Sequence, residues 1–325
     1  MMTRKQFVKS MAGIAAAKGF LGGRAQSLLM AQEKSRVPPK SCKIRDVAIM
    51  PYNLPQKQVV KAAFSTPLTT DNVLIRLRTE EGVIGWGESS PYAPITGENQ
   101  QSDVSMGRSL AELVKGRDVF ALSRISADMD DSADYNQSIK AAFEMAMWDI
   151  CGKIAGLPVC VLLGGYRDSF QTDLTVTFET PSIMASRAKE YVAAGFKAVK
   201  IKVGENPEID IQRVREIREA VGKNIALRID ANQGWTPTEA IRSLRAMEAY
   251  NIEFCEQPVK YWDLGGMRRV RNNVGIPIMA DETVHTPHNL IDVIRQEAAD
   301  MVNIKLMKAG GILQATRIAQ IADAA

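Results

Sequence analysis

The chain has 325 residues, of which 46% are hydrophobic and 24% are charged, as is usual for a soluble globular protein of one or two domains. Its net charge of +4 comes from residues 1–36, which carry seven basic residues and one acidic residue. The rest of the chain has a net charge of −2, which argues against nucleic-acid binding. The sequence contains no run of about 18 uncharged apolar residues, so no membrane-spanning helix is predicted.

The first 36 residues are typical of an export signal. Residues 3–9 resemble the twin-arginine motif, with Lys5 in place of the second arginine, and a mildly apolar stretch follows at residues 11–21. We therefore expect residues 1–36 to be disordered or removed and the protein to be periplasmic. A basic tail on a cytoplasmic protein is the alternative.

Residues 43–165 predict an α+β domain. Two β-rich segments, 72–77 and 83–87, flank a Glu80-Glu81-Gly82 turn and predict a hairpin. Helices are expected within residues 98–160, where apolar residues recur at helical spacing. A loop at about residues 53–70 is long enough to be a lid over a functional site.

Residues 170–325 predict a TIM-like (β/α) barrel. Strands alternate with amphipathic helices, which indicates parallel βαβ units with their chemistry at the carboxyl ends of the strands. Six strands do not close an eight-stranded barrel, so we expect the chain to be truncated after six β/α units. The strands are expected near residues 174–179, 198–203, 226–230, 253–256, 277–281 and 301–305.

Two of these strands end in lysine. Lys200 and Lys202 end the second strand and face the same way, because side chains alternate along a strand. Mutual repulsion and burial are expected to lower the pKa of both, as a catalytic base requires; alternatively, one of them faces solvent. Lys305 ends the sixth strand, across the barrel from Lys202. Lys308 lies beyond that strand, and a solvated loop lysine is the simpler interpretation of it.

The three strands between them each end in a carboxylate. Asp230, Glu256 and Asp281 follow the third, fourth and fifth strands. Neighbouring barrel strands lie about 4.8 Å apart, so the three carboxylates converge. A single one of them is explained by helix N-capping, but three in series favour a hard divalent cation such as Mg²⁺.

The order of these motifs resembles the muconate-lactonising branch of the enolase superfamily and, within it, the dipeptide epimerases. The similarity runs from about residue 43 to residue 325. It is carried by Lys200-Ile201-Lys202, Asp230-Ala231-Asn232, Glu256-Gln257-Pro258, Asp281-Glu282 and Ile304-Lys305, with residues 80–88 and 146–165 of the first domain.

The resemblance implies a capping domain, a barrel and a set of site residues. Asp230, Glu256 and Asp281 would hold Mg²⁺, and Lys202 and Lys305 would be the two acid/base groups. The residues implied to contact the substrate are Lys200, Asn232 and Lys308.

The activity implied is that of an isomerase that epimerises a dipeptide, derived from cell-wall peptides, by moving a proton at the carbon next to a carboxylate through a metal-stabilised enediolate. Same-fold alternatives are a cycloisomerase and an o-succinylbenzoate-forming dehydratase; an inactive truncated binding protein is a third, and a homo-oligomer is left open. In the dipeptide epimerases, acidic residues at the eighth strand hold the ammonium group of the substrate, and this sequence stops before them. Ser65 stands where Ala–Glu epimerases carry an arginine in the lid loop.

Overall fold

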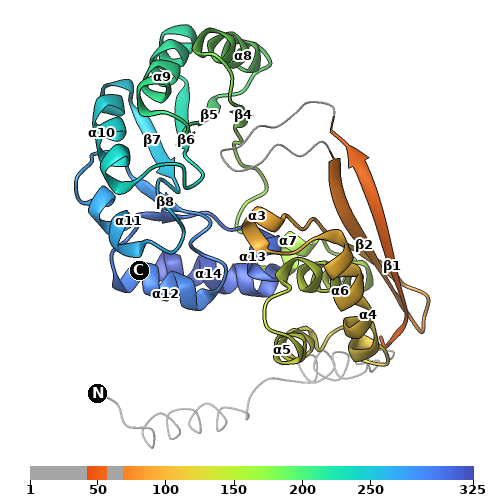
Figure 1. Ribbon diagram of the computed structural model, residues 1–325. Coiled ribbons are helices and arrows are strands. Elements are labelled where there is room, and N and C mark those ends of the chain that lie inside the picture. Colours follow the sequence, from red (N-terminus) through yellow and green to blue (C-terminus); the bar gives the residue numbers. More distant parts are fainter. Residues whose placement is uncertain (1–41, 57–68) are drawn as a thin grey trace, which may run out of the picture. The chain divides into compact units, whose positions relative to one another are not determined.

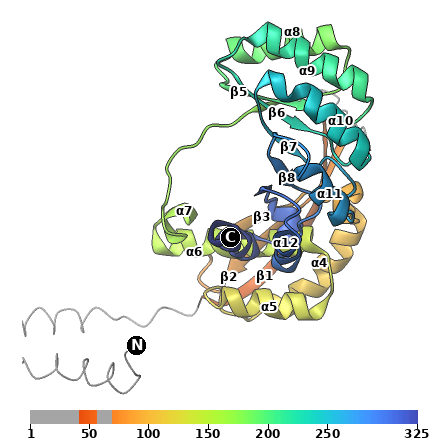
Figure 2. The same ribbon diagram turned by 90° about the vertical axis from the view of Figure 1, so that its left-hand side faces the viewer.

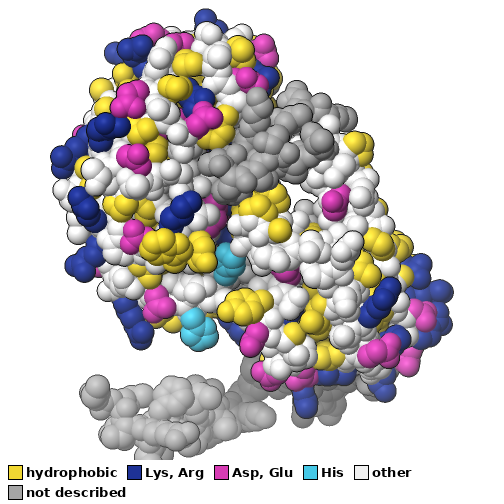
Figure 3. Space-filling view, in the orientation of Figure 1, with side chains coloured by type: hydrophobic (Ala, Val, Ile, Leu, Met, Phe, Trp, Pro, Cys, Tyr) yellow, Lys and Arg dark blue, Asp and Glu magenta, His cyan; other side chains and the backbone are white. Residues whose placement is uncertain are grey.

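The computed structural model describes residues 42–56 and 69–325. The expected export signal and Ser65 lie outside these ranges. None of the helices within them is long and apolar enough to cross a membrane. On the face drawn in Figure 3, basic and acidic side chains are interspersed.

An antiparallel sheet begins the described part of the chain. Its strands follow in the order β1 (Ile44–Pro55), β2 (Thr69–Thr79) and β3 (Ile84–Ser89), which includes the predicted hairpin. Alternate residues of β2, Val73, Ile75 and Leu77, are completely buried, as expected for a sheet covered on one face. The expected loop is shorter than predicted, because residues 53–55 pair with residues 69–71 as strand.

Five helices directly follow this sheet in the described part of the chain. They are α3 (Ala93–Thr96), α4 (Gln100–Val114), α5 (Leu122–Ser132), α6 (Gln137–Ala155) and α7 (Val159–Leu162). Two of them, α4 and α6, pack against the sheet. The α6 helix packs against β3 at two glycines, Gly85 and Gly87, which bring the two backbones into close approach.

A methyl group at Gly87 is expected to destabilise the protein by about 1–3 kcal/mol, because it would overlap the backbone carbonyl of Ala142 in α6. Urea unfolding of Gly87→Ala measures the loss. Gly265→Ala is the matched control: a methyl group there meets only the Asp263 carboxylate at 3.9 Å. Equal unfolding midpoints for Gly87→Ala and the wild type would contradict this packing.

A stretch without helix or strand, residues 163–173, links α7 to the second sheet (Figure 2). In this sheet all the strands are parallel, and they follow one another in chain order. They are β4 (Leu174–Val176), β5 (Ala198–Lys202), β6 (Ala226–Asp230), β7 (Ile252–Glu256), β8 (Ile278–Ala280) and β9 (Met301–Val302).

Helices alternate with these strands, and α8, α9 and α10 lie along one side of the sheet (Figure 1). The apolar core is formed between strands and helices by side chains such as Ile201, Ile229 and Leu244. The helices are α8 (Pro181–Ala193), α9 (Pro207–Val221), α10 (Pro237–Met247), η2 (Glu248–Tyr250), α11 (Leu264–Arg271), α12 (Pro287–Arg295), α13 (Leu306–Ala309) and α14 (Ile312–Ala324).

The last strand differs from the prediction. It ends at Val302, and Lys305 is the N-cap residue of α13, a short helix that was not expected. Because α13 packs against α6, the carboxyl end of β9 lies beside the first domain.

Candidate active site

Neighbouring strands place their charged ends side by side. Lys202 on β5 pairs in register with Asp230 on β6, and Asp230 pairs with Glu256 on β7. Because the strands are parallel and in register, their carboxyl ends meet at one edge of the sheet, and Asp281 follows β8 directly at the same edge.

Both lysines of β5 contact these carboxylates. Lys200 Nζ lies 2.9 Å from Asp230 Oδ2 and 2.6 Å from Glu256 Oε2. Lys202 Nζ lies 2.7 Å from Asp230 Oδ2 and also donates a hydrogen bond to Asn232 Oδ1. One ammonium therefore bridges Asp230 and Glu256, and both lysines lie on the same side of the sheet.

A second pair of lysines contacts Asp281. Lys305 Nζ donates to Asp281 Oδ2, and Lys308 Nζ lies 2.6 Å from Asp281 Oδ1. Lys308 is only 1% exposed, so its interpretation as a solvated loop lysine is wrong. The α13 helix turns its side chain back beneath Asp281.

For Lys200, the expected lowering of the pKa is also wrong. Burial alone would lower the pKa of Lys200, but the charges of Asp230 and Glu256 outweigh it and raise that pKa. The same balance, with Asp281 as the main partner, raises the pKa of Lys305. Lys308 has a lowered pKa, because burial and the charge of Lys305 outweigh the attraction of Asp281.

The three carboxylates lie close enough to affect one another. Burial and the neighbouring charges of Asp230 and Asp281 raise the pKa of Glu256 to about 7. Within the described residues no group of three acidic, histidine or cysteine side chains is arranged to hold a metal ion, and lysine ammonium groups contact each of these three carboxylates. Their crowded carboxylate oxygens nevertheless fit a hard divalent cation, which would relieve the repulsion.

A cavity of about 660 Å³ lies over this edge of the sheet. Its floor is formed by Lys200, Lys202, Asp230, Asn232 and Lys305. The first domain forms the facing wall with residues 69–72, 90–95 and 98–100. Lys308 is not among the lining residues, although the resemblance implied a contact with substrate.

Two residues at this edge were not predicted as site residues. Glu282 is 2% exposed and accepts a hydrogen bond from Asn232 Nδ2 at 3.1 Å. Its second oxygen, Oε2, has no hydrogen-bond partner among the residues that the structure describes. Asn303 donates to Glu256 Oε1 at 2.9 Å. In the sequence, the signal for Glu282 was its position directly after Asp281, and the signal for Asn303 was its position directly after β9.

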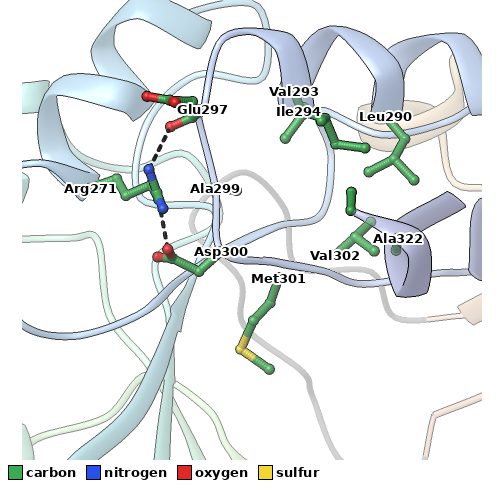
Figure 4. Close-up of a pocket in the computed structure, with 11 residues that line it drawn as sticks. Arg271, Leu290, Val293, Ile294, Glu297, Ala299, Asp300, Met301, Val302 and Ala322 are labelled. Carbon is green, nitrogen blue, oxygen red and sulfur yellow. Dashed lines mark hydrogen bonds and ion pairs between the residues drawn. The ribbon is translucent and has the colours of Figure 1, made fainter.

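Another hollow, of about 460 Å³, lies between β9, α12 and α14 (Figure 4). Its lining is largely aliphatic, as at Leu290 and Val293, and its Arg271 is held by Asp300 at 2.6 Å. None of the predicted site residues lines this hollow, so we place the chemistry in the first cavity.

Comparison with known proteins assigns the fold to a family. Residues 44–164 match the N-terminal domain of mandelate racemase and muconate lactonizing enzyme, and residues 183–325 match the enolase C-terminal domain-like family. The chain belongs to the muconate lactonizing branch of the enolase superfamily. The predicted family and its architecture, a capping domain followed by a parallel β/α domain, are therefore confirmed.

Relatives within this family include several dipeptide epimerases. The L-Ala-D/L-Glu epimerase of Clostridium acetobutylicum is 39% identical over 86% of this chain and 79% of the relative. The enzyme of the same name from Bacillus subtilis is 41% identical over 83% of this chain and 75% of the relative. The dipeptide epimerase of Enterococcus faecalis, solved with Mg and L-Leu-L-Tyr, has a TM-score of 0.85 and 39% identity, covering 87% of this chain and 80% of that one.

Proposed function

We propose that this chain catalyses Mg²⁺-dependent epimerisation of a dipeptide at the carbon next to its carboxylate. The observation that carries the proposal is the placement of Lys202 and Lys305 in one cavity, with three carboxylate-bearing strand ends between them. Relatives that share this fold at 39–41% identity are named as dipeptide epimerases, and one was solved with Mg and a dipeptide.

Each site residue is assigned a role that its position at the strand ends supports. Asp230, Glu256 and Asp281 would hold Mg²⁺, which when bound polarises the substrate carboxylate and offsets the charge that develops as the α-proton leaves. Lys202 Nζ takes the proton from one face of the α-carbon, and Lys305 Nζ donates a proton to the other face.

Two further residues act near Lys202. Asn232 accepts a hydrogen bond from Lys202 and thereby fixes the direction of its Nζ. Lys200, buried between Asp230 and Glu256, adds positive charge where the substrate carboxylate must approach.

Incubation with dipeptide pools in D₂O tests the proposal. With Mg²⁺ present, deuterium is expected at one α-carbon of the substrate, together with its epimer, and removal of Mg²⁺ with EDTA should abolish both. A cycloisomerase or dehydratase would change the substrate's skeleton or composition instead. Absence of exchange with every dipeptide, in a protein shown to bind Mg²⁺, would reject the epimerase assignment.

We further propose that the substrate derives from cell-wall peptides and that the protein is exported to the periplasm. The basic, twin-arginine-like start of the sequence supports export. Fusing residues 1–36 to a reporter that is active only after export tests this. A reporter retained in the cytoplasm would favour the alternative location.

A further inference from the structure

A buried glutamine lies between two of the carboxylate-bearing strand ends. Gln257 directly follows Glu256 at the end of β7, and its side chain is completely buried. It does not line the cavity. Any effect of Gln257 on the site must therefore act through the residues that it contacts.

The side-chain amide of Gln257 holds the segment that begins with Asp281. Its Oε1 accepts hydrogen bonds from the backbone N–H groups of Asp281, at 2.9 Å, and Thr283, at 3.2 Å. Its Nε2 donates to Thr283 Oγ1 at 2.8 Å and to the carbonyl oxygen of Val259 at 3.0 Å. The amide is thus satisfied at both ends and clamps the end of β8 to the end of β7.

The backbone of Gln257 extends the clamp to neighbouring strands. Its N–H donates to Met279 on β8 at 2.9 Å, and its carbonyl accepts from Gln233, in the loop after β6, at 2.8 Å. Gln257 has a φ of +37°, an uncommon value for a residue with a side chain. Such a conformation persists when surrounding contacts fix it, as these do.

We infer that Gln257 is a positioning residue that sets the separation of the Glu256 and Asp281 carboxylates. The inference rests on the proposed function, in which both carboxylates hold Mg²⁺. Residues that orient metal ligands typically change metal affinity by about 10–100-fold when mutated. Substitution of Gln257 is expected to change the Mg²⁺ affinity by a similar factor, although Gln257 carries no charge and does not reach the cavity.

Gln257→Met is the main test, because methionine keeps the length and flexibility of the side chain but loses its hydrogen bonds. Calorimetric titration of the whole protein with Mg²⁺ is expected to give about 10–100-fold weaker binding. Amide hydrogen exchange without Mg²⁺ should also be faster at Asp281 and Thr283, whose N–H groups lose their acceptor. This second readout does not depend on catalysis.

Leu244→Ala is the matched control, since it empties a buried position on α10 away from the strand ends and should destabilise the fold without changing Mg²⁺ affinity. A folded Gln257→Met protein that binds Mg²⁺ within threefold of the wild type would overturn the inference. No Mg²⁺ binding by the wild type would overturn the proposed function as well.

If Gln257→Met does not fold, Thr283→Val is the variant that tests the inference. It removes the hydroxyl that contacts both ends of the Gln257 amide, at 2.8 and 3.1 Å, while retaining the shape of the side chain. Mg²⁺ binding several-fold weaker than in the wild type supports the clamp. Unchanged Mg²⁺ affinity in this variant overturns it.

Discussion

Replacing Lys202 by alanine is expected to slow α-deuterium exchange of one dipeptide epimer by about 10²–10⁴-fold and to spare exchange of the other. Lys202 is on β5 and Lys305 follows β9, with β6, β7 and β8 between them. A substrate whose carboxylate lies over the middle strands presents one face of its α-carbon to each lysine. Each epimer therefore has its own base, and Lys305→Ala should show the opposite selectivity.

Mass spectrometry or NMR of the two separated epimers in D₂O measures this division of labour. Lys223→Ala is a suitable control, because Lys223 is an exposed lysine that does not line the cavity. Removal of Lys202 also leaves Asp230 with Lys200 as its ion-pair partner, so the second base is measured in a changed electrostatic setting. Exchange of both epimers at near wild-type rates in either variant would refute the assignment of two bases.

Asp281→Asn is expected to abolish measurable Mg²⁺ binding and to destabilise the fold by about 3–5 kcal/mol. Asp281 is completely buried and forms ion pairs with both Lys305 and Lys308. Its neutralisation removes a proposed metal ligand and leaves the charge of Lys308, which is 1% exposed, without its carboxylate partner. Urea unfolding and calorimetric Mg²⁺ titration measure the two effects separately.

The double variant Asp281→Asn/Lys308→Met separates stability from function. It removes the buried Lys308 ammonium together with its Asp281 carboxylate partner, and replacement of a buried ion pair by neutral groups of similar size is often tolerated. Stability is expected to recover while Mg²⁺ binding and α-exchange remain lost. Recovery of Mg²⁺ binding would show that Asp281 is not a metal ligand.

Acid should act on the same ion pairs. Burial would raise the pKa of Asp281, but Lys308 and Lys305 outweigh it and hold that pKa well below its usual range. The stabilisation is therefore present above pH ~4, the ordinary value for an aspartate, and is lost as the pH falls below it. The Asp281→Asn protein should lack this part of the acid sensitivity.

The sequence by itself determined the order of strands and helices and the residues at the ends of the strands. Alternation along β5 requires Lys200 and Lys202 to share a face, and the parallel arrangement requires Asp230 and Glu256 to lie at the same edge. Both results depend on local periodicity, which a single strand carries in its own residues. The ordered motifs were sufficient for the family as well.

Only the tertiary structure decided the environment of each charge. The sequence shows two lysines that repel each other on β5, but carboxylates from β6 and β7 contact them and raise the pKa of Lys200. Lys308 follows a strand end and has no local signal for burial, yet α13 folds it beneath Asp281. Gln257 likewise gains its role from Asp281 and Thr283, which are more than twenty residues away along the chain. The physical reason is that strand periodicity fixes the direction of a side chain, whereas its pKa and its hydrogen bonds depend on groups contributed by neighbouring strands.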